Sequence, residues 1–198
     1  MANKYDMILA AEEAFARQVA LGVIVTTPQS AFHYLIPFMF IFDFLRRTAT
    51  IRHYSRHFLF PRRLALDAAQ DILGGEDRRE RLSAIEPQIQ AWLNGLKLRS
   101  SAVQQKQMDV IHLLVDHYMN LLQVNGDTYN ALILNGYDNR QNYEAHLSRL
   151  AAEEEGLDRA IFEELGQDEK LRQKLRSERE QVKRLSEKGM DRIFQKMM

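Results

Sequence analysis

The sequence contains no cysteine, four prolines and one tryptophan among its 198 residues. Without a thiol, the chain can form no disulfide, no thiolate nucleophile and no zinc–thiolate site. It also lacks alternating strand patterns between Asn-Gly or Asp-Gly turns. No glycine-rich phosphate loop follows a strand pattern, and no serine lies in a nucleophile-elbow motif. Several common classes of enzyme are therefore excluded.

A long apolar run is also missing. The most apolar stretch, FHYLIPFMFIFDFL at residues 32–45, is interrupted by Pro37 and Asp43. A membrane-spanning helix needs about 20 apolar residues. We interpret this stretch as a buried helix or a subunit contact, in preference to a helix lying in a membrane interface. The first 15 residues carry acids where a secretory signal needs an apolar run. We expect a cytoplasmic protein, with peripheral binding at the inner face of the membrane as a less favoured option.

Apolar residues recur at helical spacing along most of the chain, which predicts an all-α fold of about eight helices in a multi-helix bundle. Proline and glycine divide the pattern. Pro61 is expected to begin a new helix, and Pro87 to divide another or leave it whole. The expected helices are 3–22, 31–58 with a break at Pro37, 61–73, 77–96, 100–124 behind a Ser100 or Ser101 cap, 128–134, 140–165 and a C-terminal helix.

The C-terminal segment, residues 167–198, is a long charged amphipathic helix. Its apolar stripe is thin and consists of Leu171, Leu175, Val182 and Leu185. The heptad pattern would place Gly189 at the next core position, which disfavours a long coiled coil. We expect residues 1–166 to form the bundle and residues 167–198 to pack as an arm on the bundle or on a second chain.

The net charge is zero, but the charge is unevenly distributed. Six arginines and no acid occur in 44–66, eight acids and one base in 153–169, and ten bases and four acids in 170–196. A neutral sum does not support nucleic-acid binding. The acidic stretch could instead complement the arginines within one chain or across a dimer.

These features predict a non-catalytic helical interaction protein. We expect it to bind a protein partner or an anionic surface through the aromatic and arginine stretch at 32–63, without a cofactor. A homo-oligomer is the favoured assembly, and a membrane surface is a less favoured partner than a protein. The candidate binding residues are Arg46, Arg47, Arg52, Arg56, Arg62 and Arg63 for charge, and Phe38, Phe40, Phe42 and Phe44 for apolar contact.

Three carboxylates, Glu12, Asp43 and Glu154, lie where the helical period predicts an apolar residue. Burial of an unpaired carboxylate is costly, so each should be paired with a base or lie at a rim. His146 also borders an apolar stripe. The alternative function is therefore a helical metal-binding enzyme of the di-metal oxidase type that uses Glu12, Asp43, Glu154 and His146. The sequence lacks the Glu-x-x-His pairs of such sites, which favours pairing with arginine.

Overall fold

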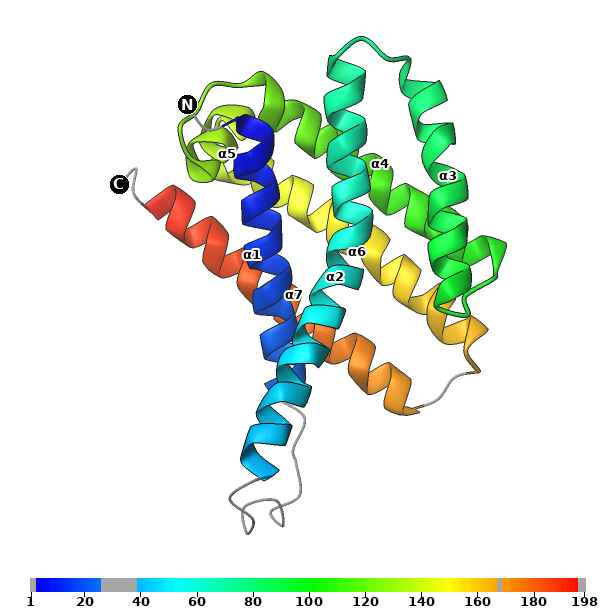
Figure 1. The fold of residues 1–198 in the computed structure, drawn as a ribbon. Helices are drawn as coiled ribbons and strands as arrows, with labels where there is room; N and C mark the ends of the chain where they lie inside the picture. The colour runs from blue at the N-terminus through cyan, green and yellow to red at the C-terminus, as the bar shows by residue number, and fades with distance from the viewer. Residues whose placement is uncertain (1–2, 26–38, 167–168, 196–198) are drawn as a thin grey trace.

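The computed structural model describes residues 3–25, 39–166 and 169–195, with side chains at all of these except 24, 25, 39–48 and 170. This part of the chain contains seven helices and no strand, which confirms the all-α prediction (Figure 1). No helix in these ranges is long and apolar enough to cross a membrane. The helices are α1 Lys4–Val25, α2 Met39–Leu73, α3 Arg78–Gly95, α4 Ser101–Gln123, α5 Tyr129–Tyr137, α6 Arg140–Glu164 and α7 Glu169–Phe194.

Helices α2 and α3 both continue through a proline. Pro61 lies inside α2, so the expectation that it begins a new helix is wrong, and Pro87 lies inside α3 without dividing it. A proline in a helix interior costs about 3 kcal/mol, because it removes one backbone hydrogen bond and crowds the preceding turn. At Pro61 the following turn is buried at Leu64, Ala65 and Leu66. The burial of this turn offsets the cost of the proline.

Side-chain caps begin four of the helices. The Ser100 hydroxyl accepts a hydrogen bond from the Ala102 N–H at the start of α4, which confirms the predicted cap. Thr128, Asn139 and Asp77 cap α5, α6 and α3 in the same way. Each cap satisfies a backbone N–H that has no partner within its own helix.

Helix α4 lies at the centre of the bundle. It contacts α1, α2, α3, α5 and α6. Ile111, Leu114 and Leu121 of α4 are almost fully buried, and they pack with Ile8 of α1 and Ile85 of α3 in one apolar core. This central helix fixes the positions of the surrounding helices.

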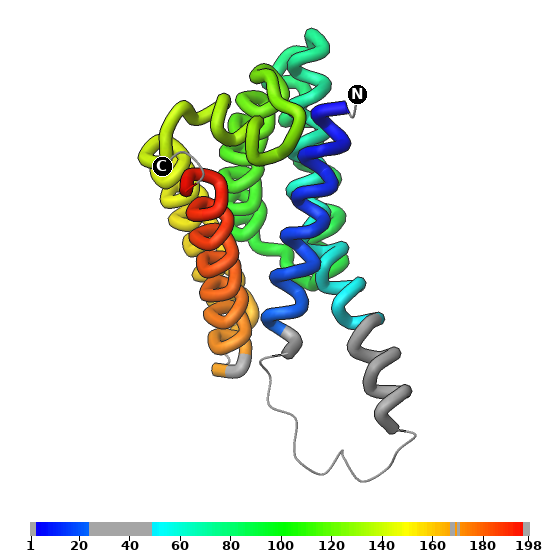
Figure 2. The backbone as a smooth tube through the Cα atoms, turned by 90° about the vertical axis from the view of Figure 1, so that its left-hand side faces the viewer, coloured from blue at the N-terminus to red at the C-terminus, as the bar shows by residue number. Residues whose placement is uncertain are grey.

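Helix α7 packs along α1 and α6. Figures 1 and 2 show it running beside α6 over most of its length. Val182, Met190, Ile193 and Phe194 supply its buried apolar contacts. Helix α7 therefore lies against the bundle of its own chain, and any contact with a second chain stays a prediction.

Candidate functional site

The predicted arginine and aromatic stretch lies only partly within the described side chains. Phe38, Phe40, Phe42, Asp43, Phe44, Arg46 and Arg47 fall outside them. Arg52, Arg56 and Arg63 are exposed on α2. Arg52 and Arg56 are available to a partner, whereas Arg63 also interacts with the Tyr5 hydroxyl of α1.

Arg62 is a correction to the sequence interpretation, because it does not offer its charge at the surface. Only 8% of the residue is exposed. Consecutive residues of a helix point about 100° apart, so Arg62 faces the bundle while Arg63 faces solvent. The Arg62 guanidinium lies 3.1 Å from a Glu12 carboxylate oxygen and 3.2 Å from a Glu154 oxygen. It also lies 4.8 Å from the centroid of the Phe58 ring, within cation–π range.

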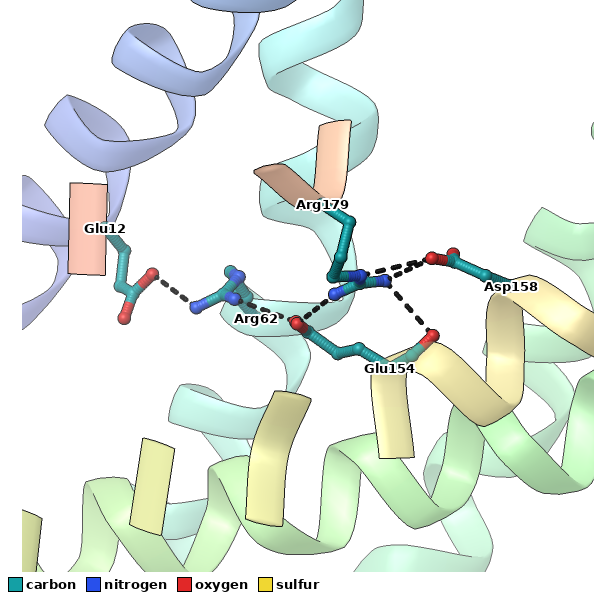
Figure 3. Close-up of polar contacts among 5 residues, drawn as sticks. All are labelled: Glu12, Arg62, Glu154, Asp158 and Arg179. Atoms are coloured by element: carbon teal, nitrogen blue, oxygen red, sulfur yellow. Dashed lines mark hydrogen bonds and ion pairs between the residues drawn. The ribbon is translucent and has the colours of Figure 1, made fainter. Parts of the chain in front are cut away.

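A second arginine, Arg179, extends the contacts of Arg62 with Glu12 and Glu154 into a network across four helices (Figure 3). Arg179 of α7 donates to Glu154 and, at 2.8 Å, to Asp158 of α6. It also donates to the Glu154 backbone carbonyl. We call Glu12, Arg62, Glu154, Asp158 and Arg179 the ion network. The buried carboxylates Glu12 and Glu154 are therefore paired with arginine, as the cost of burial predicts.

The network shifts the ionisation of its members. Burial alone would lower the pKa of Arg62, but the nearby carboxylates, Glu12 foremost, outweigh it and hold the pKa above its ordinary value. Burial raises the pKa of Asp158 despite the opposing charge of Arg179. The nearby Glu178 carboxyl also has a raised pKa because of burial. Burial thus disfavours the charged form of both carboxyls where α6 meets α7.

The alternative metal site is not assembled by the described residues. These contain no group of three or more histidine, aspartate or glutamate side chains that could hold a metal ion. Arg62 lies between Glu12 and Glu154 and binds both. Asp43, another member of the proposed ligand set, lies outside the described side chains.

Two buried histidines form a second feature beside the network. The rings of His117 on α4 and His146 on α6 stack with centroids 4.7 Å apart and planes inclined by 13°. Nδ1 of His117 lies 2.7 Å from the Tyr137 hydroxyl. Burial lowers the pKa of His146 to about 4, and burial likewise holds the pKa of His117 well below its ordinary range. Both imidazoles are therefore neutral near pH 7.

Four members of the ion network, Glu12, Arg62, Glu154 and Arg179, and the two stacked histidines line one groove. It has a volume of about 840 Å³, is partly open to solvent and lies between α1, α6 and α7. Glu12, Glu154 and His146, which the sequence singled out, all line it together with Arg62 and His117. The structure thus gathers these residues around a groove in which arginine is the partner of the acids.

Sequence interpretation missed Arg179 and Asp158, although the helical period contained a signal for both. Arg179 lies between Leu175 and Val182 on the apolar stripe of α7, and Asp158 lies one turn after Glu154 on α6. A base and an acid on facing apolar stripes indicate a buried pair. Their partnership depends on how α7 packs against α6, which the sequence does not specify.

Comparisons with protein-family models, curated proteins and solved structures find no match to this chain. Its function is therefore inferred from its own residues.

Proposed function

We propose that this protein is a non-catalytic helical interaction protein that binds an acidic protein surface through the exposed arginines of α2. The observation that carries the proposal is the exposure of Arg52, Arg56 and Arg63. None of the three forms an ion pair with another described side chain, whereas Arg62 is saturated by Glu12 and Glu154. A cytoplasmic location is part of this proposal.

The three arginines form one stripe. Separations of four and eleven residues place Arg56 and Arg63 within about 40° of Arg52 around the helix axis, and the stripe is about 16 Å long. Guanidinium groups suit such a surface because each can bind a carboxylate through two parallel hydrogen bonds. Spaced charges of one sign also attract an acidic surface from a distance.

A second copy of the chain supplies a surface of the required chemistry. Glu155 and Glu163 are exposed on α6, in the acidic part of the sequence. Glu155 has only a long contact of 3.8 Å with Arg159, four residues along the same helix. Because the whole chain is neutral, two copies can associate without net repulsion.

The test is sedimentation velocity of the full chain at about 50 mM and about 500 mM salt. We expect the wild type to self-associate at low salt and to dissociate at high salt. Arg52→Glu/Arg56→Glu should weaken self-association at least tenfold. The matched control is Arg172→Glu/Arg176→Glu, which makes the same charge change at exposed positions of α7 and should associate as the wild type does.

A charge swap identifies the acidic partner. Adding Glu155→Arg/Glu163→Arg to the α2 double variant should restore association if these acids face the arginines. A wild type that is monomeric at every salt concentration would contradict the proposal. If that monomer instead floats with vesicles of anionic phospholipid, and does so through Arg52 and Arg56, an anionic surface replaces the acidic protein as the partner.

A further inference from the structure

We propose that the groove between α1, α6 and α7 binds a neutral, mainly apolar small molecule that hydrogen-bonds to the imidazole of His146. This site is separate from the arginine stripe of α2, so its test does not depend on the proposed function. The proposal stands on the shape of the groove and on a side chain in its wall whose ring nitrogens have no hydrogen-bond partner among the described residues.

Small residues create the space. The groove of about 840 Å³ falls in the range of about 300–1,000 Å³ that is usual for small-molecule pockets. Gly189 and Ser186 line it from α7, Ala11 from α1 and Ala151 from α6. A methyl group at Gly189 would meet no atom within 4 Å. The groove is therefore open at this point because α7 carries a glycine there, and a larger side chain would occupy the space.

His146 is the unpartnered polar group. Only 5% of the residue is exposed, and it lines the groove. No hydrogen bond reaches either of its ring nitrogens from the described residues, although the neighbouring His117 uses Nδ1 with the Tyr137 hydroxyl. The buried side-chain atoms without a partner among the described residues belong to Tyr54, Tyr118 and Glu164, so the His146 ring nitrogens are accessible from outside the protein. A bound molecule in the groove can therefore replace water as their hydrogen-bond partner.

The surroundings define the chemistry of the ligand. Both stacked imidazoles are neutral, and a neutral imidazole offers one donor and one acceptor nitrogen. The charged side chains of the ion network that line the wall are paired with one another. The other charged residues of the wall are all exposed to solvent: Glu144, Glu155, Lys183, Glu187, Lys188 and Arg192. Apolar contacts come from Leu114, Leu150, Met190 and Ile193. The groove thus favours an uncharged molecule with an apolar body and a hydroxyl, carbonyl or ring nitrogen that faces His146.

The probe is Nile red, a neutral dye with an apolar ring system and a carbonyl oxygen. Its fluorescence should rise on titration with the full-length protein and saturate at about one dye per chain. Gly189→Phe should weaken binding at least tenfold because the ring fills the groove. His146→Phe keeps a planar ring but removes both nitrogens, and should also weaken binding at least tenfold. Ala91→Phe, at an exposed position of α3, is the matched control and should bind as the wild type does.

Circular dichroism of each variant establishes that it is folded, and Ser186→Phe replaces Gly189→Phe if the latter does not fold. Binding that never saturates, or that survives the groove-filling variant, would overturn the site. Loss of binding in Gly189→Phe together with full retention in His146→Phe would overturn the assignment of His146. Equal loss in Ala91→Phe would show that the dye reports a general change in the protein surface, which also overturns the proposal.

Discussion

Arg62 joins three helices because its guanidinium binds a carboxylate from α1 and another from α6 while its own backbone belongs to α2. Moving charged groups out of water is costly, and their mutual attraction repays this only when hydrogen bonds are well formed. Removing one partner from such a group leaves an uncompensated buried charge. The contribution of Arg62 is therefore measured best by comparing its removal with removal of the whole group.

Arg62→Met is expected to lower the free energy of unfolding by about 3–5 kcal/mol, because Glu12 and Glu154 lose their shared cation. The triple variant Glu12→Leu/Arg62→Met/Glu154→Leu should recover most of that loss, since Arg179 keeps Asp158. Urea unfolding followed by circular dichroism measures both. Arg56→Met, at an exposed position of the same helix, should change stability by no more than about 0.5 kcal/mol. A loss below about 1 kcal/mol for Arg62→Met would contradict the buried pairing.

His146 gives stability a defined pH dependence. Burial, followed by the charges of Arg149 and Arg62, lowers its pKa from 6.5 to about 4 in the folded protein. The unfolded chain therefore binds more protons between these two values. The stability associated with neutral His146 is fully present above about pH 6.5 and is lost as the pH falls toward 4, with a slope of up to about 1.4 kcal/mol per pH unit.

His146→Gln removes this titration. Between about pH 6.5 and pH 4, the free energy of unfolding of this variant should fall less steeply than that of the wild type. The two slopes should differ by up to about 1.4 kcal/mol per pH unit. Urea unfolding at several pH values measures the difference. Parallel curves for His146→Gln and the wild type would contradict a buried neutral imidazole.

At the scale of the element, sequence periodicity predicted the helices but not the effect of their prolines. The expected ranges 100–124 and 140–165 agree closely with α4 and α6, because strong apolar stripes and capping residues define both. Pro61 was wrongly expected to begin a helix and Pro87 was left open, because the sequence does not reveal how much packing surrounds a proline. The same limit explains Arg62, which was grouped with the surface arginines because the sequence does not show which helices cover α2 at that point.

Replacing glycine by alanine is expected to have opposite effects on stability at two positions. Gly189→Ala should raise the free energy of unfolding by about 0.5–1 kcal/mol, because it lies in a helix interior and its added methyl meets no atom within 4 Å. Gly126→Ala should lower stability by about 1–3 kcal/mol, because its methyl would lie 2.9 Å from the Leu132 backbone nitrogen. Thermal unfolding compares the two variants directly. Changes of the same sign would contradict the packing at one of these positions.

At the scale of the whole molecule, α7 is held differently from the central helix. Helix α4 is surrounded by five other helices, whereas α7 contacts α1, α5 and α6 at the side of the bundle. Arg179 is its main polar attachment, since it binds both Glu154 and Asp158. The sequence predicted a separate amphipathic segment here. It could not predict that Glu154 and Asp158 hold this segment, because the position of α6 against α7 is determined by the fold.

Arg179→Met should therefore loosen α7 before it affects the core. We expect backbone amide hydrogen exchange in α7 to speed up at least tenfold, which corresponds to about 1.4 kcal/mol of local stability, while amides of α4 keep their protection. Arg176→Met is the matched control, because Arg176 is exposed and its nearest acid, Glu180, lies on the same helix. Its exchange should equal that of the wild type. If Arg179→Met speeds exchange in α4 as much as in α7, then the helices open as one cooperative unit and the ion network stabilises the whole bundle.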